Sequence, residues 1–258
     1  TLILNYLSFV LSASIYSFIK LRRKDFDMIF GIQLSPIFSM IPAILLKKIL
    51  RKPLYFWVLD IWPDSILGAG IKSSFVHGVL NRLCVRIYSA ADILFLSSKS
   101  FEKRLTEMQV SSPQMIYFPQ WIESNFISSQ SLKIPEDGEV SKLMSQWKDK
   151  IIFTFTGNIG EAQDFPNLIG GLKKCSNISD IVLLIIGDGR YKEELEKKIK
   201  DECLDDVVFC LGYYPAKYMS LFYYYSSYLV LPLKDEPIFS YTLPGKIQSY
   251  MSSGKPII

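Results

Sequence analysis

The sequence predicts an α/β protein with two domains, each built around a parallel sheet. Short apolar segments alternate with helical patterns along most of the chain, which is typical of parallel strands connected by helices. The length of 258 residues suits two domains of roughly 100 to 150 residues each. A polar, turn-rich passage after residue 119 interrupts the alternation. We therefore expect an N-terminal domain over residues 1–125, a linker over 126–150 and a C-terminal domain over 151–258.

Composition and charge narrow the class of protein. Hydrophobic residues make up 49% and aromatic residues 14% of the chain, and the mean hydropathy is +0.21, so a sizeable core is available. The net charge of +4 is modest, and most basic residues are dispersed among acids. Nucleic acid is therefore not expected as a partner.

The sequence contains few residues that could form a metal site or a catalytic triad. His77 is the only histidine, and we expect it to be structural or on the surface. The cysteines form no CxxC pair, so neither a zinc site nor a Ser-His-Asp triad is expected, and we expect no metal ion and no cofactor. They lie in predicted helices or strands and are expected to be reduced core residues of a cytosolic protein: Cys84, Cys175, Cys203 and Cys210.

The first nineteen residues carry no charge. Large apolar residues recur there at helical spacing, at Leu4, Leu7, Leu11, Ile15 and Phe18. Basic residues follow at 20–24, and a second basic cluster lies at 47–52. This helix could span a bilayer, lie at its surface or be buried, and the cations could meet anionic lipid or cap helix ends. We expect a membrane-surface partner, with the protein cytoplasmic and peripheral to the inner face of the cell membrane.

The N-terminal domain should consist of alternating strands and helices. Strands are expected over 27–32, 54–59, 92–96 and 114–118, and helices over 36–50, 74–88 and 98–108. Asp25-Phe26-Asp27 matches the DxD pattern of some metal-dependent enzymes. It precedes its strand, whereas open α/β sheets bind ligands at the carboxyl ends of strands, so we interpret it as a solvated turn.

Two aspartates follow the strand over 54–59. Asp60 and Asp64 lie at its carboxyl end, where a ligand would bind. Asp60 is a candidate general base, or a group that orients an acceptor hydroxyl. Asp64 could act in the same way or cap the following turn.

The C-terminal domain repeats a strand, a glycine turn and a helix. Strands are expected over 151–156, 181–186, 207–211 and 228–231, and helices over 165–172, 191–200 and 218–225. Glycines follow the first two strands, in Gly157-Asn158-Ile159-Gly160 and in Gly187-Asp188-Gly189. Such glycines let backbone N–H groups approach a phosphate. The second motif is not a dinucleotide fingerprint, because no third glycine follows at the right spacing.

The stretch 241–258 combines a loop, a helix and the start of a strand. Pro244 suits a first helical turn, Gly254 suits a helix end, and Ile247, Tyr250 and Met251 would form one apolar face. Lys246 is then near a helix N-terminus, where a cation and free N–H groups attract the same anion. The alternative is a solvated surface lysine.

Four motifs in order, FTGNIGEAQD, IIGDGRYKEEL, FLGYYPAKYM and YTLPGKIQSYMSSGKPII, resemble the second half of glycosyltransferase family 4. The resemblance covers at least residues 54–258 and is strongest to bacterial enzymes that build O-antigen, capsule or colanic-acid chains. It implies the GT-B fold, in which two Rossmann-like domains with parallel sheets hold the acceptor and the nucleotide sugar. We expect both termini to be truncated, because the chain starts without methionine and stops as a strand begins.

The resemblance also implies site residues. The catalytic residues would be Asp60, beside the acceptor, and Lys246, at the diphosphate. Those beside the donor diphosphate, sugar and nucleotide would be Gly157, Asn158, Gly160, Glu161, Gln163, Gly187, Gly189, Lys192, Leu243, Pro244, Gly245 and Ser249. Tyr213 and Tyr214 would flank the base.

The chain departs from the family pattern at several positions. Many members carry two glutamates eight positions apart, where this chain has Tyr241 and Ser249. The usual lysine and arginine of the glycine loop are Gln163 and Asn158 here. Residues that could supply the missing acid are Glu161, Asp235 and Glu236.

The resemblance implies a retaining, metal-independent enzyme. It would move a sugar, an N-acetylated hexosamine or deoxyhexosamine, from UDP to a lipid-linked or growing saccharide acceptor. A UDP-sugar 2-epimerase of the same fold is one alternative. A non-catalytic, nucleotide-sugar-binding membrane scaffold is another, favoured by the missing glutamates.

Overall fold

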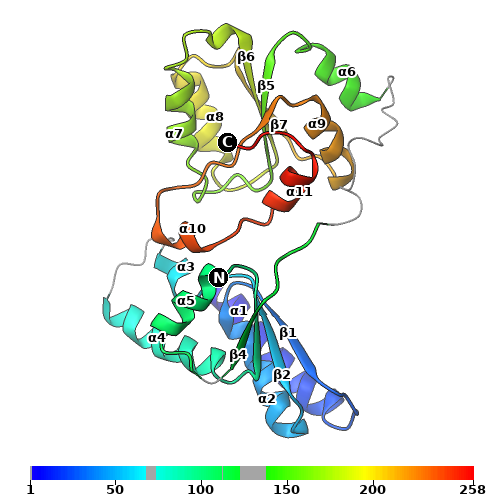
Figure 1. The fold of residues 1–258 in the computed structure, drawn as a ribbon, viewed down its shortest axis with the longest axis vertical. Helices are drawn as coiled ribbons and strands as arrows, with labels where there is room; N and C mark the ends of the chain where they lie inside the picture. The colour runs from blue at the N-terminus through cyan, green and yellow to red at the C-terminus, as the bar shows by residue number, and fades with distance from the viewer. Residues whose placement is uncertain (1, 68–73, 112, 123–137) are drawn as a thin grey trace. The chain divides into compact units, whose positions relative to one another are not determined.

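The protein folds into two compact units, each built on a four-stranded parallel sheet (Figure 1). The computed structural model describes residues 2–67, 74–111, 113–122 and 138–258. Unit 1 comprises residues 1–119 and 236–243, and unit 2 comprises residues 120–235 and 244–258. The predicted α/β class with two parallel sheets is confirmed.

Unit 1 has strands in the order β1-β2-β3-β4, all parallel. They are β1 (Ile29–Gln33), β2 (Leu54–Val58), β3 (Ile93–Leu96) and β4 (Gln114–Tyr117). The helices are α1 (Leu2–Tyr16), α2 (Ile41–Leu50), α3 (Asp64–Leu67), α4 (Ser74–Tyr88), α5 (Ser100–Glu107) and α10 (Pro237–Tyr241), with a π-helical turn at Ser17–Leu21 and a 3-10 turn at Ile37–Met40. The strands and helices predicted for this domain are therefore all present, within a few residues at their ends.

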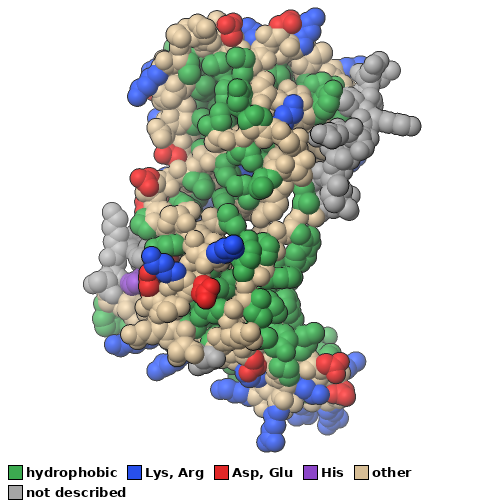
Figure 2. All heavy atoms as spheres, in the orientation of Figure 1, with side chains coloured by type: hydrophobic (Ala, Val, Ile, Leu, Met, Phe, Trp, Pro, Cys, Tyr) green, Lys and Arg blue, Asp and Glu red, His purple; other side chains and the backbone are tan. Residues whose placement is uncertain are grey.

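One face of the unit 1 sheet is buried under helices, and the other is partly exposed among the described residues. Alternate residues of β1 and β2 pack into a single core with α2, α4 and α5. On the opposite face Phe30 and Ile32 are exposed, and Phe30, Tyr55 and Phe118 each lie about 5.4 to 6.1 Å from the ring of Phe95. Hydrophobic side chains are visible over part of these strands in Figure 2.

Helix α10 joins unit 1, although the sequence analysis assigned all of residues 151–258 to the C-terminal domain. Ile238 is buried in the unit 1 core, with Phe239 and Tyr241 packed against it. A five-residue helix has too little internal hydrogen bonding to be stable alone, so its packing decides where it lies.

The N-terminal segment is a helix with no buried part. Among the described residues it is the one helix whose length and composition would let it cross a membrane, over Leu4–Leu21, and none of that window is buried. The predicted helix is confirmed, and its burial in a core is excluded for the described unit. Asp25 lies in the loop before β1 with an exposed side chain that accepts a hydrogen bond from Nζ of Lys52 at 3.1 Å, so the predicted solvated position is confirmed.

Unit 2 has strands in the order β7-β6-β5-β8, all parallel. They are β5 (Ile151–Thr156), β6 (Ile181–Ile186), β7 (Val208–Gly212) and β8 (Tyr228–Leu229). The helices are α6 (Glu139–Ser145), α7 (Phe165–Leu172), α8 (Lys192–Asp201), α9 (Met219–Tyr225) and α11 (Ile247–Ser252). Two cores lie on the two faces of the sheet, one under α7 and α8 and the other under α6, α9 and α11.

Three expectations for this unit need correction. Part of the predicted linker is α6, because Val140, Met144 and Trp147 recur at helical spacing and are buried in the core. Met251 is 67% exposed and does not join the apolar face formed by buried Tyr250. Two of the four cysteines, Cys175 and Cys203, are exposed rather than in the core; they lie after the last turns of α7 and α8.

Candidate functional site

Three strand-end loops of unit 2 are joined by backbone hydrogen bonds. The amide of Gly157, after β5, donates to the carbonyl of Ile186 at 2.8 Å, and the amide of Gly187, after β6, donates to Gly212 at 2.8 Å. The amide of Ile159 donates to the carbonyl of Asp188 at 2.8 Å. The carboxyl ends of β5, β6 and β7 therefore form one continuous surface, at the edge of the sheet where such folds bind ligands.

Two glycines allow the loops to approach this closely. Gly187 has φ +146°, and a Cβ there would lie 1.9 Å from the carbonyl oxygen of Gly157. A Cβ on Gly189 would lie 2.1 Å from the carbonyl oxygen of Ile159. Gly189 therefore serves backbone packing, and no side chain fits at either position.

These loops and α11 enclose a pocket of about 390 Å³. It is lined by Thr156, Gly157, Asn158, Ile186, Gly187, Asp188, Tyr213, Tyr214, Ala216, Met219 and Lys246. Six of the residues proposed from the sequence are thus brought together. Tyr213 is 75% exposed, whereas Tyr214 packs edge-on against Phe222 with ring centroids 5.0 Å apart.

Lys246 is the cation of this pocket. It is the N-cap residue of α11, and its Nζ lies 3.8 Å from the ring centroid of Phe155 and 3.2 Å from where a Cβ on Gly157 would be. Burial lowers the pKa of Lys246 to about 8. Within the described part of the chain its Nζ is buried without a hydrogen-bond partner, which contradicts the alternative of a solvated surface lysine. A buried amine without a polar partner is costly, and an anion in the pocket would relieve that cost.

Other residues named from the sequence lie outside this lining set. Gln163 accepts a hydrogen bond from the amide of Gly160 at 3.0 Å, so it orders the glycine loop. Lys192 lies 4.0 Å from Glu196 of its own helix. The remaining residues outside the lining set are Glu161, Gly189, Pro244, Gly245 and Ser249 in unit 2, and Leu243 in unit 1. None of the three candidates for the missing acid lines the pocket.

Several lining residues were not proposed from the sequence. Asp188 lies between the two glycines that were named, and its carboxylate accepts a hydrogen bond from the amide of Gly189 at 2.8 Å. Ala216 and Met219 come shortly after Tyr213 and Tyr214 in the sequence. That closeness to two proposed base contacts could have suggested them. Thr156 and Ile186 are the last residues of their strands and are buried, so the pattern that predicted the strands gave no sign that they border a pocket.

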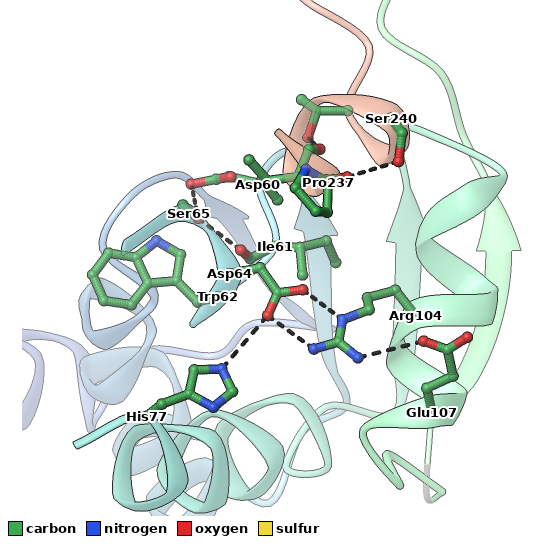
Figure 3. Close-up of polar contacts among 12 residues, drawn as sticks. Asp60, Ile61, Trp62, Asp64, Ser65, His77, Arg104, Glu107, Pro237 and Ser240 are labelled. Atoms are coloured by element: carbon green, nitrogen blue, oxygen red, sulfur yellow. Dashed lines mark hydrogen bonds and ion pairs between the residues drawn. The ribbon is translucent and has the colours of Figure 1, made fainter. Parts of the chain in front are cut away.

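In unit 1, Asp60 lies at the carboxyl end of β2, as predicted. Its carboxylate accepts a hydrogen bond from the hydroxyl of Ser65 at 2.9 Å (Figure 3). Burial raises the pKa of Asp60 above its usual value, against the lowering effect of the Ser65 hydrogen bond. The carboxyl group is therefore better suited to hold a proton than an exposed aspartate is.

Asp64 has a different environment. Its carboxylate forms a bidentate ion pair with Arg104 of α5, with one contact of 2.9 Å, and Nε2 of His77 lies 3.9 Å away (Figure 3). Both carboxylate oxygens of Asp64 are engaged with Arg104, and this ion pair joins the start of α3 to α5 within unit 1. His77 is half-buried, consistent with the structural role expected for it. The same residues line a unit 1 pocket of about 210 Å³ that also includes Glu236 and Tyr241.

Metal ligands do not cluster in the described residues. No group of three or more histidine, cysteine, aspartate or glutamate side chains is close enough there to hold an ion. The chemistry that the described residues offer at the unit 2 pocket is electrostatic, through Lys246.

Comparison with known proteins identifies the C-terminal part of the chain. Residues 142–258 match the family described as "Glycosyl transferases group 1". This part of the chain is therefore similar to group 1 glycosyl transferases. It contains every lining residue of the Lys246 pocket.

The similarity to curated proteins extends over both units. The chain is 27% identical over 226 residues to WbjE of Pseudomonas aeruginosa, a probable glycosyltransferase, covering 84% of this chain and 54% of that protein. It is 26% identical over 210 residues to WcaI of Escherichia coli, a putative colanic acid biosynthesis glycosyl transferase, covering 78% of this chain and 49% of that protein. The chain therefore spans about half the length of these curated relatives.

A solved structure confirms the fold. Anabaena HepE in complex with UDP superposes with a TM-score of 0.66 at 18% identity, covering 98% of this chain and 62% of that one. The predicted GT-B fold and the resemblance to bacterial surface-polysaccharide glycosyltransferases are confirmed.

Proposed function

We propose that the protein is a retaining glycosyltransferase that moves a sugar from a UDP-sugar to a lipid-linked or growing surface-polysaccharide acceptor. The observation that carries this proposal is Lys246, a buried amine without a polar partner among the described residues, in a pocket lined by two glycine turns and two tyrosines. UDP has the complementary chemistry, with a diphosphate for the cation and a base for an aromatic ring. The UDP complex of Anabaena HepE and the names of WbjE and WcaI support the choice.

In the reaction the bond between the anomeric carbon and the diphosphate breaks, the acceptor oxygen bonds to that carbon on the same face, and negative charge grows on the leaving UDP. The ammonium of Lys246 stabilises that charge in a pocket where water screens it little. Tyr213 and Tyr214 hold the base, while Gly157 and Asn158 lie beside the diphosphate and sugar. No metal ion takes part. Asp60 receives or orients the proton of the acceptor hydroxyl.

The sugar we propose is an N-acetylated hexosamine or deoxyhexosamine. The test is a donor screen with the complete protein, in which UDP release is followed for different UDP-sugars with membrane extract as the acceptor. We expect UDP release only with acceptor, an unchanged rate with a chelator, and a product whose anomeric configuration matches the donor.

Other outcomes of the screen would refute the proposal. Conversion of UDP-N-acetylglucosamine without acceptor would identify a 2-epimerase. Binding of UDP-sugars without any turnover would identify a non-catalytic scaffold.

We also propose that unit 1 contacts the inner face of the cell membrane through α1. The unburied apolar window Leu4–Leu21 is followed by Arg22, Arg23 and Lys24, and this pairing of apolar and cationic groups fits an anionic lipid surface. In vesicle flotation we expect binding to phosphatidylglycerol vesicles to exceed binding to phosphatidylcholine vesicles. The double substitution Leu11→Glu with Ile15→Glu should lower binding by about tenfold or more, because two charges enter the apolar phase.

A matched control keeps the membrane test specific. Phe75 and Val79 of α4 are 79% and 41% exposed, and the double substitution Phe75→Glu with Val79→Glu adds the same two charges elsewhere on unit 1. Equal loss of binding in both variants, or no preference for anionic vesicles, would exclude α1 as the membrane contact.

A further inference from the structure

Two residues one helical turn apart both contact the end of β5. Lys246 precedes α11 and Tyr250 lies four residues later, with its amide donating to the carbonyl of Lys246 at 3.0 Å. The Nζ of Lys246 lies over the ring of Phe155 and against Gly157. The hydroxyl of Tyr250 accepts a hydrogen bond from the amide of Thr156 at 2.8 Å. Phe155, Thr156 and Gly157 are consecutive, so both side chains are set by the same three residues.

Tyr250 is held firmly in place. It is fully buried, and its hydroxyl also donates to the carbonyl of Thr156 at 3.4 Å. The ring of Tyr223 packs edge-on against it, with centroids 5.4 Å apart, and the Tyr223 hydroxyl lies 3.0 Å from Oγ1 of Thr156. Ser249 adds a contact of 3.4 Å to the Tyr223 hydroxyl. The amide of a strand-end residue is thereby satisfied by a side chain from a helix ninety-four positions later.

The position of Lys246 depends on the attachment of α11 to β5 through Tyr250. Helix α11 has six residues, which is too short to be stable by its own hydrogen bonds. The Nζ of Lys246 makes no hydrogen bond to the described residues, so no polar contact of its own fixes it. Its place in the pocket is therefore set by where α11 is attached to β5.

We infer that Tyr250 is a positioning residue, whose hydroxyl bond to the backbone of Thr156 holds the Lys246 ammonium at the diphosphate position. The hydroxyl of Tyr250 does not touch the substrate; it acts through the helix. This inference rests on the proposed function only where UDP is the probe. The pKa of the Lys246 amine, which reports its position in the pocket, can be measured without UDP.

The test compares Tyr250→Phe with Tyr224→Phe in the complete protein. Tyr224 lies on α9 of the same unit with an exposed side chain, so the control removes the same hydroxyl outside the pocket. Competitive acetylation of Lys246, read by mass spectrometry across pH, gives the pKa of its amine. In the parent protein we expect a pKa of about 8. In Tyr250→Phe the amine should move toward water, and its pKa should rise toward about 10.4.

UDP binding supplies the second readout. Tyr250→Phe should weaken UDP affinity by about tenfold, while Tyr224→Phe leaves it unchanged. A Tyr250→Phe variant that melts at a lower temperature but keeps the parent Lys246 pKa and UDP affinity would overturn the inference, because a purely structural role predicts that pattern.

Two further results keep the test decisive. If Tyr250→Phe does not fold, 3,5-difluorotyrosine at position 250 retains shape and hydroxyl while weakening the acceptor, and the Lys246 pKa should still rise. An unchanged pKa there would overturn the inference. If the parent protein binds no UDP, the proposed function fails, whereas a raised Lys246 pKa in the variant would still support the positioning role.

Discussion

The substitution Lys246→Met should abolish most sugar transfer. Methionine keeps the length of the side chain and suits a buried place beside the ring of Phe155, but it removes the charge. We expect transfer to fall by about 100-fold or more, as when one preorganised group that stabilises a transition state is removed. UDP affinity should fall by about tenfold or more. The free energy of unfolding should be unchanged or higher, because a buried unpaired cation is lost.

The control for this variant is Lys174→Met. Lys174 is an exposed residue after α7 in the same unit, so the chemical change is identical while the pocket is untouched. Transfer and UDP affinity should match the parent protein. If Lys246→Met retains the parent UDP affinity, the pocket is not the diphosphate site and the proposed function loses its main support.

The pH dependence of UDP affinity, compared between the parent protein and Lys246→Met, provides an internal check. Burial lowers the pKa of Lys246 to about 8, so the attracting ammonium is present below that pH and is lost above it. UDP affinity of the parent protein should therefore fall as pH rises through 8, by at most about tenfold per pH unit. The Lys246→Met variant should show no such fall.

Much of the fold could be predicted from the sequence, because the patterns that indicate strands, helices and turns are local. The strands β5 and β6 and helix α4 begin and end where the apolar runs and periodicity placed them. Glycines were also recognised after β5 and β6, where the structure brings the two loops together. These features depend on side-chain pattern and on backbone freedom, which a single sequence contains.

Contacts between segments that are far apart in the sequence could not be predicted in this way. Helix α10 packs into unit 1 through Ile238, and nothing in its five residues indicates which core it joins. Tyr250 was predicted to be buried, but its hydrogen bond to Thr156 depends on the tertiary fold. Lys246 was predicted as an anion contact, and the structure adds that its amine is buried without a described partner. Spacing predicts burial well, whereas partners of polar atoms follow only from the packed chain.

The substitution Gly187→Ala should destabilise unit 2 and disrupt its pocket together. At φ +146° an alanine is strained, and its Cβ would lie 1.9 Å from the carbonyl oxygen of Gly157, which cannot move without breaking the bond between Gly157 and Ile186. We expect urea denaturation to show a loss of about 3 kcal/mol or more in the free energy of unfolding. UDP affinity should fall as the loops separate.

Gly170→Ala is the matched change that should have the opposite sign. Gly170 lies inside α7, and a Cβ there meets no atom within 4 Å, so alanine should stabilise the helix by about 0.5 to 1 kcal/mol. A Gly187→Ala protein as stable as the parent, with UDP affinity intact, would mean that the loops after β5 and β6 are not in the close contact described here. Loss of stability with unchanged UDP affinity would separate the two roles of Gly187: the backbone contact would support the fold, and the ligand would be bound elsewhere.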